Sequence, residues 1–394
     1  MATPDVDNLP YADGDFYAFE DLLTDKERDR LHEIRAWLGT HVKPHAAQWW
    51  NDAEFPAHMV PELAELDVVS PVYRQGYSNL FAGLCHAEFT RADTSFATFM
   101  GVHDGLFTGS IEALASEEQK AAWLPDIYAL KKIGAFGLTE PLGGSDVAGG
   151  LRTTARRDGD SWILNGEKRW IGNATWSDWV IIYARDVDTN QVKGFLVDTA
   201  TEGYTATKIE NKIALRTVQN ADIKLENVRI SDDFHLKGAN TFKDVNKVLK
   251  VTRLAVAWQA VGQQMAAFDI ARRYAVERTQ FGKPLASFQL IQEQLVKILG
   301  NTVSSMGMMV RLAQLEDLGR AKDEQSALAK AFTTARMRES VALGRSILGG
   351  NGIVTDYGMA KVFADAEAIY SYEGTYEVNT LVTGRAITGV AAFV

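Results

Sequence analysis

Ser371-Tyr372-Glu373-Gly374-Thr375-Tyr376 interrupts two apolar, helix-like runs near the end of the chain. The run before it carries Val362, Ala366 and Ile369 at helical spacing, and the run after it covers residues 378–387. The stretch predicts a helix break with one carboxylate, Glu373, at its tip. A carboxylate aimed into a cavity with aromatic walls has a raised pKa and accepts a proton more readily near neutral pH. Because an isolated stretch of this kind is more often a solvated loop, a catalytic role needs support from elsewhere in the chain.

The composition is that of an ordinary soluble globular protein. The 394 residues are 46% hydrophobic and 23% charged, which suits two or three domains. A net charge of −10 without a basic run argues against nucleic acid as a partner. The single cysteine, Cys85, rules out a disulfide framework and is expected in the core rather than as a nucleophile or metal ligand. With no signal-peptide pattern and no run of eighteen apolar residues, we expect no membrane insertion and a reduced, cytoplasmic location.

The chain changes its pattern twice. Residues 1–133 are predicted to be helical, with capping boxes at Thr24-Asp25-Lys26-Glu27 and Ser116-Glu117-Glu118-Gln119. The first box precedes apolar residues at helical spacing, namely Leu31, Ile34, Leu38 and Val42. Residues 134–246 instead carry short β-rich runs at 162–164, 179–183, 194–197 and 221–225. Asn165-Gly166 predicts a hairpin turn between two such runs, so this domain is expected to be an antiparallel sheet or small barrel.

Residues 247–394 return to long helical stripes. One stripe is Val261, Met265, Phe268, Ala271 and Ala275, and another is Ile291, Leu295, Ile298, Thr302, Met306, Met309 and Ala313. Stripes of this length favour an antiparallel four-helix bundle. The predicted class is therefore α+β, with an N-terminal all-α domain, a middle antiparallel β domain and a C-terminal helical bundle that carries Glu373.

Support for Glu373 comes from a cluster about 230 residues upstream. Phe136-Gly137-Leu138-Thr139-Glu140-Pro141-Leu142-Gly143-Gly144-Ser145-Asp146 offers backbone amides and a hydroxyl in a glycine-containing turn, which allows close approach of a polar ring edge or a phosphate. Arg169-Trp170-Ile171-Gly172-Asn173 adds an indole beside a glycine, a flat wall for stacking. Each motif alone is more often structural. Together they indicate a platform for a flat cofactor with polar edges.

Two further motifs follow in the last third of the chain, Glu277-Arg278-Thr279-Gln280-Phe281-Gly282 and Leu348-Gly349-Gly350-Asn351-Gly352. Together with the motifs above, they have the order and spacing of the motifs of the acyl-CoA dehydrogenase family. The chain resembles that family from about residue 20 onward, nearest the glutaryl-CoA dehydrogenases and the plant short-chain acyl-CoA oxidases. The resemblance implies FAD as cofactor and α,β-dehydrogenation of an acyl-CoA to the trans-2-enoyl-CoA. Glu373 matches the base that takes the α-proton, while its own N–H and a flavin ribityl hydroxyl would bind the thioester oxygen.

The resemblance also assigns further residues. The positions that match flavin contacts within one subunit are Phe136, Leu138, Thr139, Ser145, Trp170, Gly172, Thr375 and Glu377. Those that match contacts to the FAD of a neighbouring subunit are Arg278, Phe281, Gln289, Gly349 and Gly350. Those on the substrate side are Ser145, Arg253, Tyr372, Gly374, Ala97 and Thr98. A site shared between subunits implies a homotetramer, a dimer of dimers, and the expected electron acceptor is an electron-transferring flavoprotein.

Two departures from the family pattern bear on the substrate and the acceptor. Ala97 and Thr98 stand where glutaryl-CoA members carry an arginine and a serine, so a distal carboxylate would lack its cation, whereas Phe96, Phe99 and Met100 suggest an apolar acyl pocket. Gly172 replaces the usual Thr or Ser at the flavin N5 edge, which could admit dioxygen. Against an oxidase, the chain ends without an S-K-L-type peroxisomal signal.

The leading interpretation is thus a short- to medium-chain acyl-CoA dehydrogenase. The alternatives are an acyl-CoA oxidase, a decarboxylating glutaryl-CoA dehydrogenase with an unusual carboxylate anchor, and a flavin- or CoA-binding scaffold without catalysis.

Overall fold

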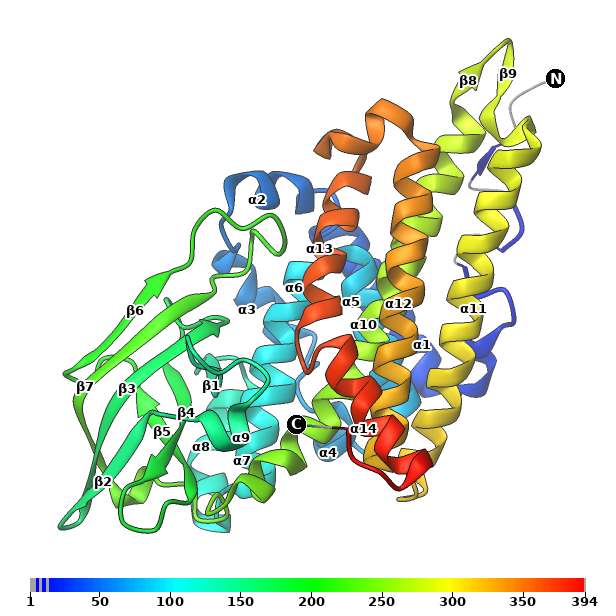
Figure 1. The fold of residues 1–394 in the computed structure, drawn as a ribbon. Helices are drawn as coiled ribbons and strands as arrows, with labels where there is room; N and C mark the ends of the chain where they lie inside the picture. The colour runs from blue at the N-terminus through cyan, green and yellow to red at the C-terminus, as the bar shows by residue number, and fades with distance from the viewer. Residues whose placement is uncertain (1–4, 7–8, 12–13, 393–394) are drawn as a thin grey trace.

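The computed structural model describes residues 5–6, 9–11 and 14–392 and contains a helical domain, a β domain and a second helical domain in that order (Figure 1). The helices of the first domain are α1 (Asp25–His41), α2 (Ala46–Asp52), α3 (Val60–Glu65), α4 (Pro71–Gln75), α5 (Asn79–Ala92), α6 (Thr94–Met100), the π-helix η4 (Gly101–Thr108), α7 (Gly109–Leu114) and α8 (Glu117–Tyr128). Both predicted capping boxes are present, at the starts of α1 and α8. The predicted order of domains is confirmed.

The β domain is one seven-stranded sheet. Its elements are β1 (Gly134–Gly137), α9 (Val147–Gly150), β2 (Thr154–Asp158), β3 (Ser161–Ile171), β4 (Trp179–Asp186), β5 (Val192–Asp198), β6 (Tyr204–Lys208) and β7 (Ala221–Ser231). The strand order is β1-β4-β2-β3-β7-β6, and β5 pairs with β4. Four strands cover the four predicted β-rich runs. The sheet is mixed rather than wholly antiparallel, because β4 runs parallel to β1 and to β2.

The predicted hairpin turn at Asn165-Gly166 is wrong. These residues lie inside β3, at a register shift against β7 between Leu164 and Gly166. Gly166 has φ 147°, and a Cβ there would come within 2.6 Å of Thr153 Oγ1, so close approach of the neighbouring chain explains the glycine. The β2–β3 turn lies instead at Gly159-Asp160, where Gly159 supplies the positive φ of 61°.

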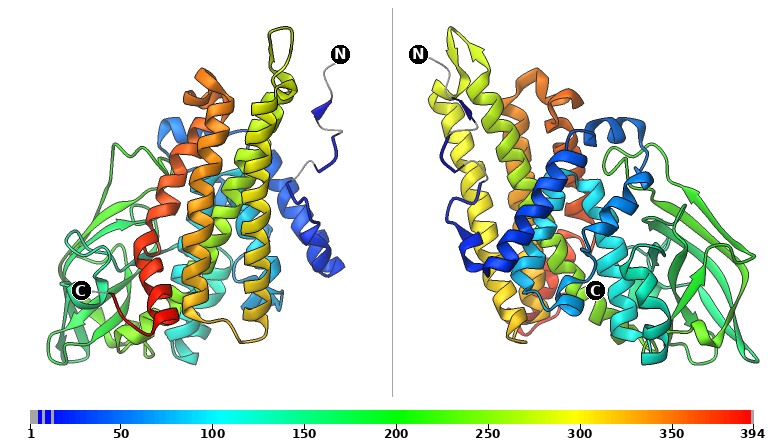
Figure 2. Two further views of the ribbon diagram at one scale, coloured as in Figure 1. Left: turned by 45° about the vertical axis from the view of Figure 1, so that its right-hand side comes forward. Right: turned by 180° about the vertical axis from the view of Figure 1, so that it is seen from behind.

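The second helical domain is the predicted bundle. It contains α10 (Phe242–Glu277), α11 (Gln289–Asp317), α12 (Asp323–Ile347), α13 (Met359–Ser371) and α14 (Tyr376–Thr388), with a small hairpin of β8 (Thr279–Gln280) and β9 (Lys283–Pro284) after α10. The helix α10 also packs on α5, and a Cβ at Gly262 of α10 would lie 2.1 Å from the Ala87 carbonyl oxygen of α5. The two helical domains therefore share one core, and the β domain lies at one side of them (Figure 2).

A buried ionic cluster joins all three domains. Lys361 Nζ of α13 lies 2.6 Å from Asp93 Oδ2, at the start of α6, and 2.9 Å from Asp365 Oδ2. Asp365 Oδ1 accepts hydrogen bonds from Trp50 Nε1 of α2 at 2.9 Å and from the Leu215 N–H of the β domain at 2.6 Å. Because α13 leads directly into the Glu373 link, this cluster also fixes the element that carries the acid.

Replacing Asp365 by alanine should lower the free energy of unfolding by about 2–4 kcal/mol, because two buried donors lose their acceptor while Lys361 keeps Asp93. The matched control is Asp365→Asn, which retains an acceptor oxygen and should lose less. Urea unfolding of both variants measures the difference. Equal losses would show that the hydrogen bonds to Trp50 and Leu215 contribute nothing beyond the charge.

Candidate active site

Glu373 lies in the link between α13 and α14, and the predicted helix break is confirmed. Glu373 and Gly374 have positive φ angles of 55° and 81°. This conformation costs a non-glycine residue roughly 1–2 kcal/mol, so the surroundings must hold it. The hydroxyl of Thr375 caps α14 by accepting the Val378 N–H at 3.2 Å.

The carboxylate of Glu373 turns toward α10. Thr252 Oγ1 donates a hydrogen bond to Glu373 Oε2 at 2.7 Å. Burial raises the pKa of Glu373 above its ordinary value of 4.5, and the hydrogen bond from Thr252 and the charges of Arg253 and Lys330 limit that rise. A carboxylate with a fixed orientation and a raised pKa is suited to take a proton near neutral pH.

Two residues around Glu373 were missed by sequence reasoning, Thr252 and Lys330. Both are polar residues within buried helical stripes: Thr252 follows Val245 and Val248 on α10, and Lys330 lies between Ala327 and Thr334 on α12. Each is less than 4% exposed. A lysine in such a stripe is a usable signal, because a fully buried lysine is rare unless it has a partner. Arg253, in contrast, was predicted, and its guanidinium pairs with Asp323 of α12.

Tyr372, the residue before Glu373, forms hydrogen bonds with uncharged polar side chains of α6 and α10. Tyr372 OH donates to Gln259 Oε1 at 2.6 Å, and it also bonds to the Thr98 hydroxyl. Ala97 and Thr98 are both buried, and Gln259 Nε2 donates to the Ala97 carbonyl at 3.4 Å. Burial raises the pKa of the Tyr372 hydroxyl, so it stays protonated. The structure thus brings these three predicted substrate-side residues together beside Glu373.

Aromatic rings cover the other side of α6. The Phe55 ring lies 4.7 Å from Phe99, 5.2 Å from Trp176 and 5.8 Å from Phe96, measured between centroids. The buried cation near this helix, Lys361, is already held by two carboxylates. This side of α6 is therefore apolar and neutral, and Phe96 and Phe99 lie in the core.

The upstream cluster forms one platform in the β domain. The loop after β1 is fixed to β3: the Arg169 N–H donates to the Thr139 carbonyl at 2.8 Å, and Lys168 Nζ donates to the Leu138 carbonyl at 3.1 Å. Lys168 also pairs with Glu140 Oε1 at 2.8 Å, where burial lowers the pKa of Lys168 to about 8. Phe136 lies below this loop, with its ring 5.2 Å from Tyr183.

Trp170 and Gly172 form the edge of the same platform. Trp170 is 52% exposed and has φ 66°, at a register shift between β3 and β7 that lies between Lys168 and Ile171. Gly172 is buried, and a Cβ there would lie 3.0 Å from Val102 Cγ2 of η4. An exposed indole on a twisted strand beside a glycine fits a planar, stacked cofactor.

The π-helix η4 connects this edge to the acid. Val102 meets Gly172, and three residues further a Cβ at Gly105 would lie 3.7 Å from Thr252 Cγ2, the side chain that binds Glu373. The same short helix therefore lies against both the flat platform and the support of the base. Single π-helical turns occur frequently at functional sites. No local pattern in the sequence predicts this π-helix.

Three other predicted residues lie at the starts of α9 and α14. Ser145 is exposed in the turn before α9, Thr375 is the N-cap of α14, and Glu377 is exposed in the first turn of α14. Gly374 lies beside Glu373, with its carbonyl bound by Lys330 Nζ at 2.7 Å.

A second predicted set is not brought to Glu373 by this chain. Arg278 and Phe281 lie at the β8–β9 hairpin, Gln289 starts α11, and Gly349 and Gly350 follow α12; all are exposed, Phe281 by 91%. In Figure 1 they lie at the opposite end of the bundle from α14. The helix α13 alone, with 13 residues, separates the two ends by about 20 Å.

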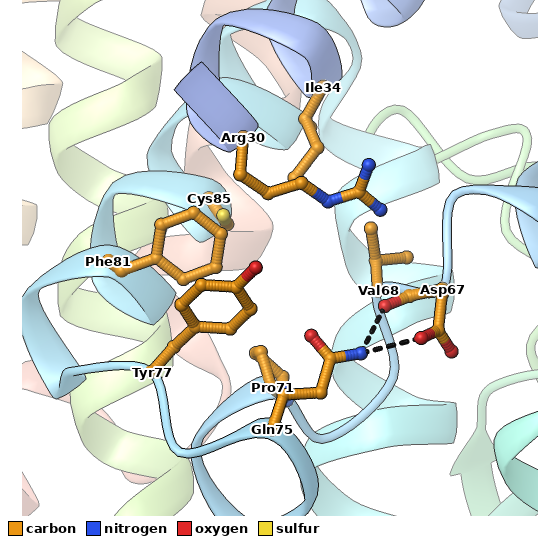
Figure 3. A pocket seen from close by; sticks show the side chains of 9 residues that line it. All are labelled: Arg30, Ile34, Asp67, Val68, Pro71, Gln75, Tyr77, Phe81 and Cys85. Atoms are coloured by element: carbon orange, nitrogen blue, oxygen red, sulfur yellow. Dashed lines mark hydrogen bonds between the residues drawn. The ribbon is translucent and has the colours of Figure 1, made fainter. Parts of the chain in front are cut away.

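Cys85 lies in the core, as predicted. Burial raises the pKa of its thiol, which stays protonated. It lines a cavity of about 10 Å³, the space of one water, between α1, α4 and α5 (Figure 3). Neither this cavity nor an open groove of about 500 Å³ beside Trp50 and Phe363 includes Glu373. Among the described residues, no helix has the length and apolar character to cross a bilayer, and no cluster of His, Cys, Asp or Glu could hold a metal ion.

Comparisons with known proteins identify the family of the chain. The chain matches the models of the acyl-CoA dehydrogenase N-terminal domain over residues 24–131, the middle domain over 135–228 and the C-terminal domain over 242–388. It is 34% identical to the human mitochondrial short-chain specific acyl-CoA dehydrogenase over 361 residues, covering 89% of this chain and 87% of that protein.

Two solved structures are similar over nearly their whole length. A glutaryl-CoA dehydrogenase from Mycobacterium smegmatis in complex with FADH2 has a TM-score of 0.94 and 34% identity, covering 98% of this chain and 100% of that one. Butyryl-CoA dehydrogenase from Megasphaera elsdenii has a TM-score of 0.88 and 28% identity, covering 93% and 98%. Together with the platform at Trp170 and the acid at Glu373, these matches show that the chain belongs to the acyl-CoA dehydrogenase family, the flavin-dependent oxidoreductases that use FAD.

Proposed function

We propose that this protein oxidises a short- to medium-chain acyl-CoA to the trans-2-enoyl-CoA, with Glu373 as the acceptor of the α-proton. The observation that carries the proposal is the link at residues 372–375, which presents a half-buried carboxylate with a raised pKa and a fixed orientation. A scaffold without catalysis would not need a base held in a strained backbone conformation.

The chain also offers a donor for the thioester oxygen. The N–H of Glu373 has no acceptor among the described residues. An α-proton of a thioester is a weak acid, so a hydrogen bond must stabilise the oxygen as negative charge develops there. FAD, bound on the platform of Leu138, Thr139 and Trp170, would accept the β-hydride at N5. Glu373 would then hold the α-proton, with Thr252 fixing the carboxylate that receives it.

The substrate is inferred from the neutral, aromatic wall. A distal carboxylate placed beside Ala97 would be buried without a cation, at a cost of several kcal/mol. This argues against glutaryl-CoA despite the likeness to a glutaryl-CoA dehydrogenase. A monocarboxylic acyl chain has no such cost.

Replacing Ala97 by arginine should therefore tighten the binding of glutaryl-CoA about tenfold or more, since a charge-assisted hydrogen bond becomes available. Ala97→Leu adds bulk without charge and is the matched control. The dissociation constants of glutaryl-CoA and pentanoyl-CoA measure the effect. If arginine and leucine change glutaryl-CoA binding equally, Ala97 does not face the distal end of the acyl chain.

The electron acceptor is inferred to be an electron-transferring flavoprotein rather than dioxygen. Gly172 removes a side chain at the cofactor edge, but Val102 occupies the adjacent space, at 3.0 Å from the position of a Cβ. The glycine therefore does not by itself open a path for oxygen. An acyl-CoA oxidase remains the second candidate because Gly172 also removes a hydroxyl from this edge.

Assembly into a homotetramer, a dimer of dimers, would explain the second set of predicted residues. Phe281 is 91% exposed, and Leu290 and Ile353 at the same end of the bundle are also exposed apolar residues. A neighbouring subunit covering this end would bury them, and Arg278 could then bind the pyrophosphate of that subunit's FAD.

An anaerobic titration tests the proposed function. The yellow holoenzyme is mixed with butyryl-, octanoyl- or glutaryl-CoA while the flavin absorbance is followed, and air is then admitted and peroxide assayed. Bleaching by the monocarboxylic thioesters with slow reoxidation is expected. Rapid peroxide release would identify an oxidase, bleaching by glutaryl-CoA alone would restore the dicarboxylic substrate, and no bleaching would support a scaffold.

A further inference from the structure

Lys330 of α12 is a buried cation that the proposed reaction leaves unexplained. Its side chain has 0% exposure. Its Nζ donates to the Tyr370 carbonyl at 2.8 Å and to the Gly374 carbonyl at 2.7 Å. Tyr370 lies in the last turn of α13 and Gly374 directly follows Glu373, so the two bonds hold the chain on both sides of the acid.

The contacts of Lys330 suit a residue that fixes the backbone. The carbonyl of Tyr370 is one of the last four in α13, which have no hydrogen-bond partner within the helix. These carbonyls form the negative end of the helix dipole, where a positive charge is stabilising. The Gly374 carbonyl also accepts Asn379 Nδ2 at 2.9 Å, so a charged and an uncharged donor share this oxygen. Between these anchors Glu373 keeps its positive φ of 55°.

The charge of Lys330 also acts on the carboxylate. Burial lowers the pKa of Lys330 to about 7, and the groups that face it are Glu373 from the link, Glu377 from α14 and Arg253 from α10. The charges of the two carboxylates raise the pKa of Lys330, whereas the charge of Arg253 lowers it. In turn, Lys330 is one of the groups that hold down the pKa of Glu373.

We propose that Lys330 is a positioning residue for the base: its ammonium group clamps the carbonyls on either side of Glu373 and stabilises the ionised carboxylate that accepts the proton. This inference rests on the proposed function for the role of Glu373 in catalysis, but the clamp itself does not depend on activity.

Four substitutions separate the clamp from the charge. Lys330→Met removes both, whereas Asn379→Leu removes an uncharged donor to the same Gly374 carbonyl. Lys330→Arg keeps the charge, and Lys330→Gln keeps a donor in case the methionine variant does not fold. Hydrogen exchange of the peptide covering residues 370–378 reports the clamp, and the pH dependence of anaerobic flavin reduction by butyryl-CoA reports the charge.

In Lys330→Met, exchange in this peptide should accelerate about tenfold or more, and the acid limb of the rate profile should move up by about one pH unit. Asn379→Leu should accelerate exchange without moving the limb, and Lys330→Arg should keep the limb near that of the wild type. The KM should change less than kcat in each case.

If hydrogen exchange of residues 370–378 is unchanged in Lys330→Met, Lys330 does not clamp the backbone. If the acid limb of the pH–rate profile does not move in Lys330→Met, Lys330 does not stabilise the ionised carboxylate of Glu373. If the wild-type flavin is not reduced by any acyl-CoA, the proposed function fails, while the exchange comparison still decides the clamp.

Discussion

Glu373→Gln is expected to lower the rate of anaerobic flavin reduction by an acyl-CoA about 10²–10⁴-fold, the usual contribution of a positioned general base. Glutamine has the shape of glutamate and can still accept the Thr252 hydroxyl, which donates at 2.7 Å in the wild type. The backbone N–H of residue 373 is unchanged. FAD content and acyl-CoA binding should therefore remain close to those of the wild type, and stopped-flow absorbance measures the loss.

The pH dependence supplies a second test of the same role. Glu373 accepts a proton only when ionised, so the wild-type rate should rise with pH through a pKa above the ordinary value of 4.5. Glu373→Gln should lack this limb. Because the folded-state pKa is raised, the ionised acid costs folding free energy above pH 4.5, and the glutamine variant should unfold no more easily than the wild type at neutral pH.

A nearby surface carboxylate is the control. The side chain of Glu367 on α13 is half-exposed and, within the described part of the chain, forms an ion pair with the exposed Arg338, an interaction worth about 0–1 kcal/mol. Glu367→Gln should leave flavin reduction unchanged. A similar loss in both variants would mean that net charge near α13, rather than a base at position 373, controls the rate.

The sequence predicted the local part of the site well. Capping boxes, helical stripes and the break at Glu373 depend on neighbours within a few residues, and the structure has each of them. The wrong prediction of a turn at Asn165-Gly166 also came from reading only neighbouring residues. Its local signal is a turn signal, but the contact that requires the glycine comes from Thr153, on the far side of the β2–β3 turn.

Long-range partners were beyond the sequence. Thr252 and Glu373 are 121 residues apart, and nothing local marks either as the partner of the other. The π-helix η4 lies between the platform and α10, and no local pattern in its sequence predicts it. The motif at Leu138–Glu140 is visible in the sequence, but nothing local marks Lys168 as the buried residue that fixes it.

That lysine carries the second large prediction. Lys168→Met should lower the free energy of unfolding by about 3–5 kcal/mol, because it leaves Glu140, 6% exposed, without its cation. The Leu138 carbonyl would lose its donor at the same time, so the loop after β1 would no longer be fixed to β3. The purified variant should therefore also contain less FAD, measured as flavin absorbance per mole of protein.

The cause can be isolated with the double variant Glu140→Gln/Lys168→Met. Glutamine buries no charge, and its single carbonyl oxygen can still accept one of the two backbone N–H groups that bond to Glu140, that of Arg152 at Oε2 (2.6 Å) or that of Thr153 at Oε1 (2.9 Å). The double variant should therefore be more stable than Lys168→Met alone.

Lowering the pH should reduce the stability difference between the wild type and Lys168→Met. The pKa of Glu140 is lowered in the wild type, so its contribution to stability is present above pH 4.5 and is lost as the pH falls through the folded-state pKa. Without Lys168 the buried acid favours its protonated form, so the stability difference between wild type and Lys168→Met should shrink as the pH is lowered. A difference that stays constant with pH, or a double variant no more stable than the single one, would mean that lost packing around Lys168 rather than an unpaired carboxylate destabilises the platform.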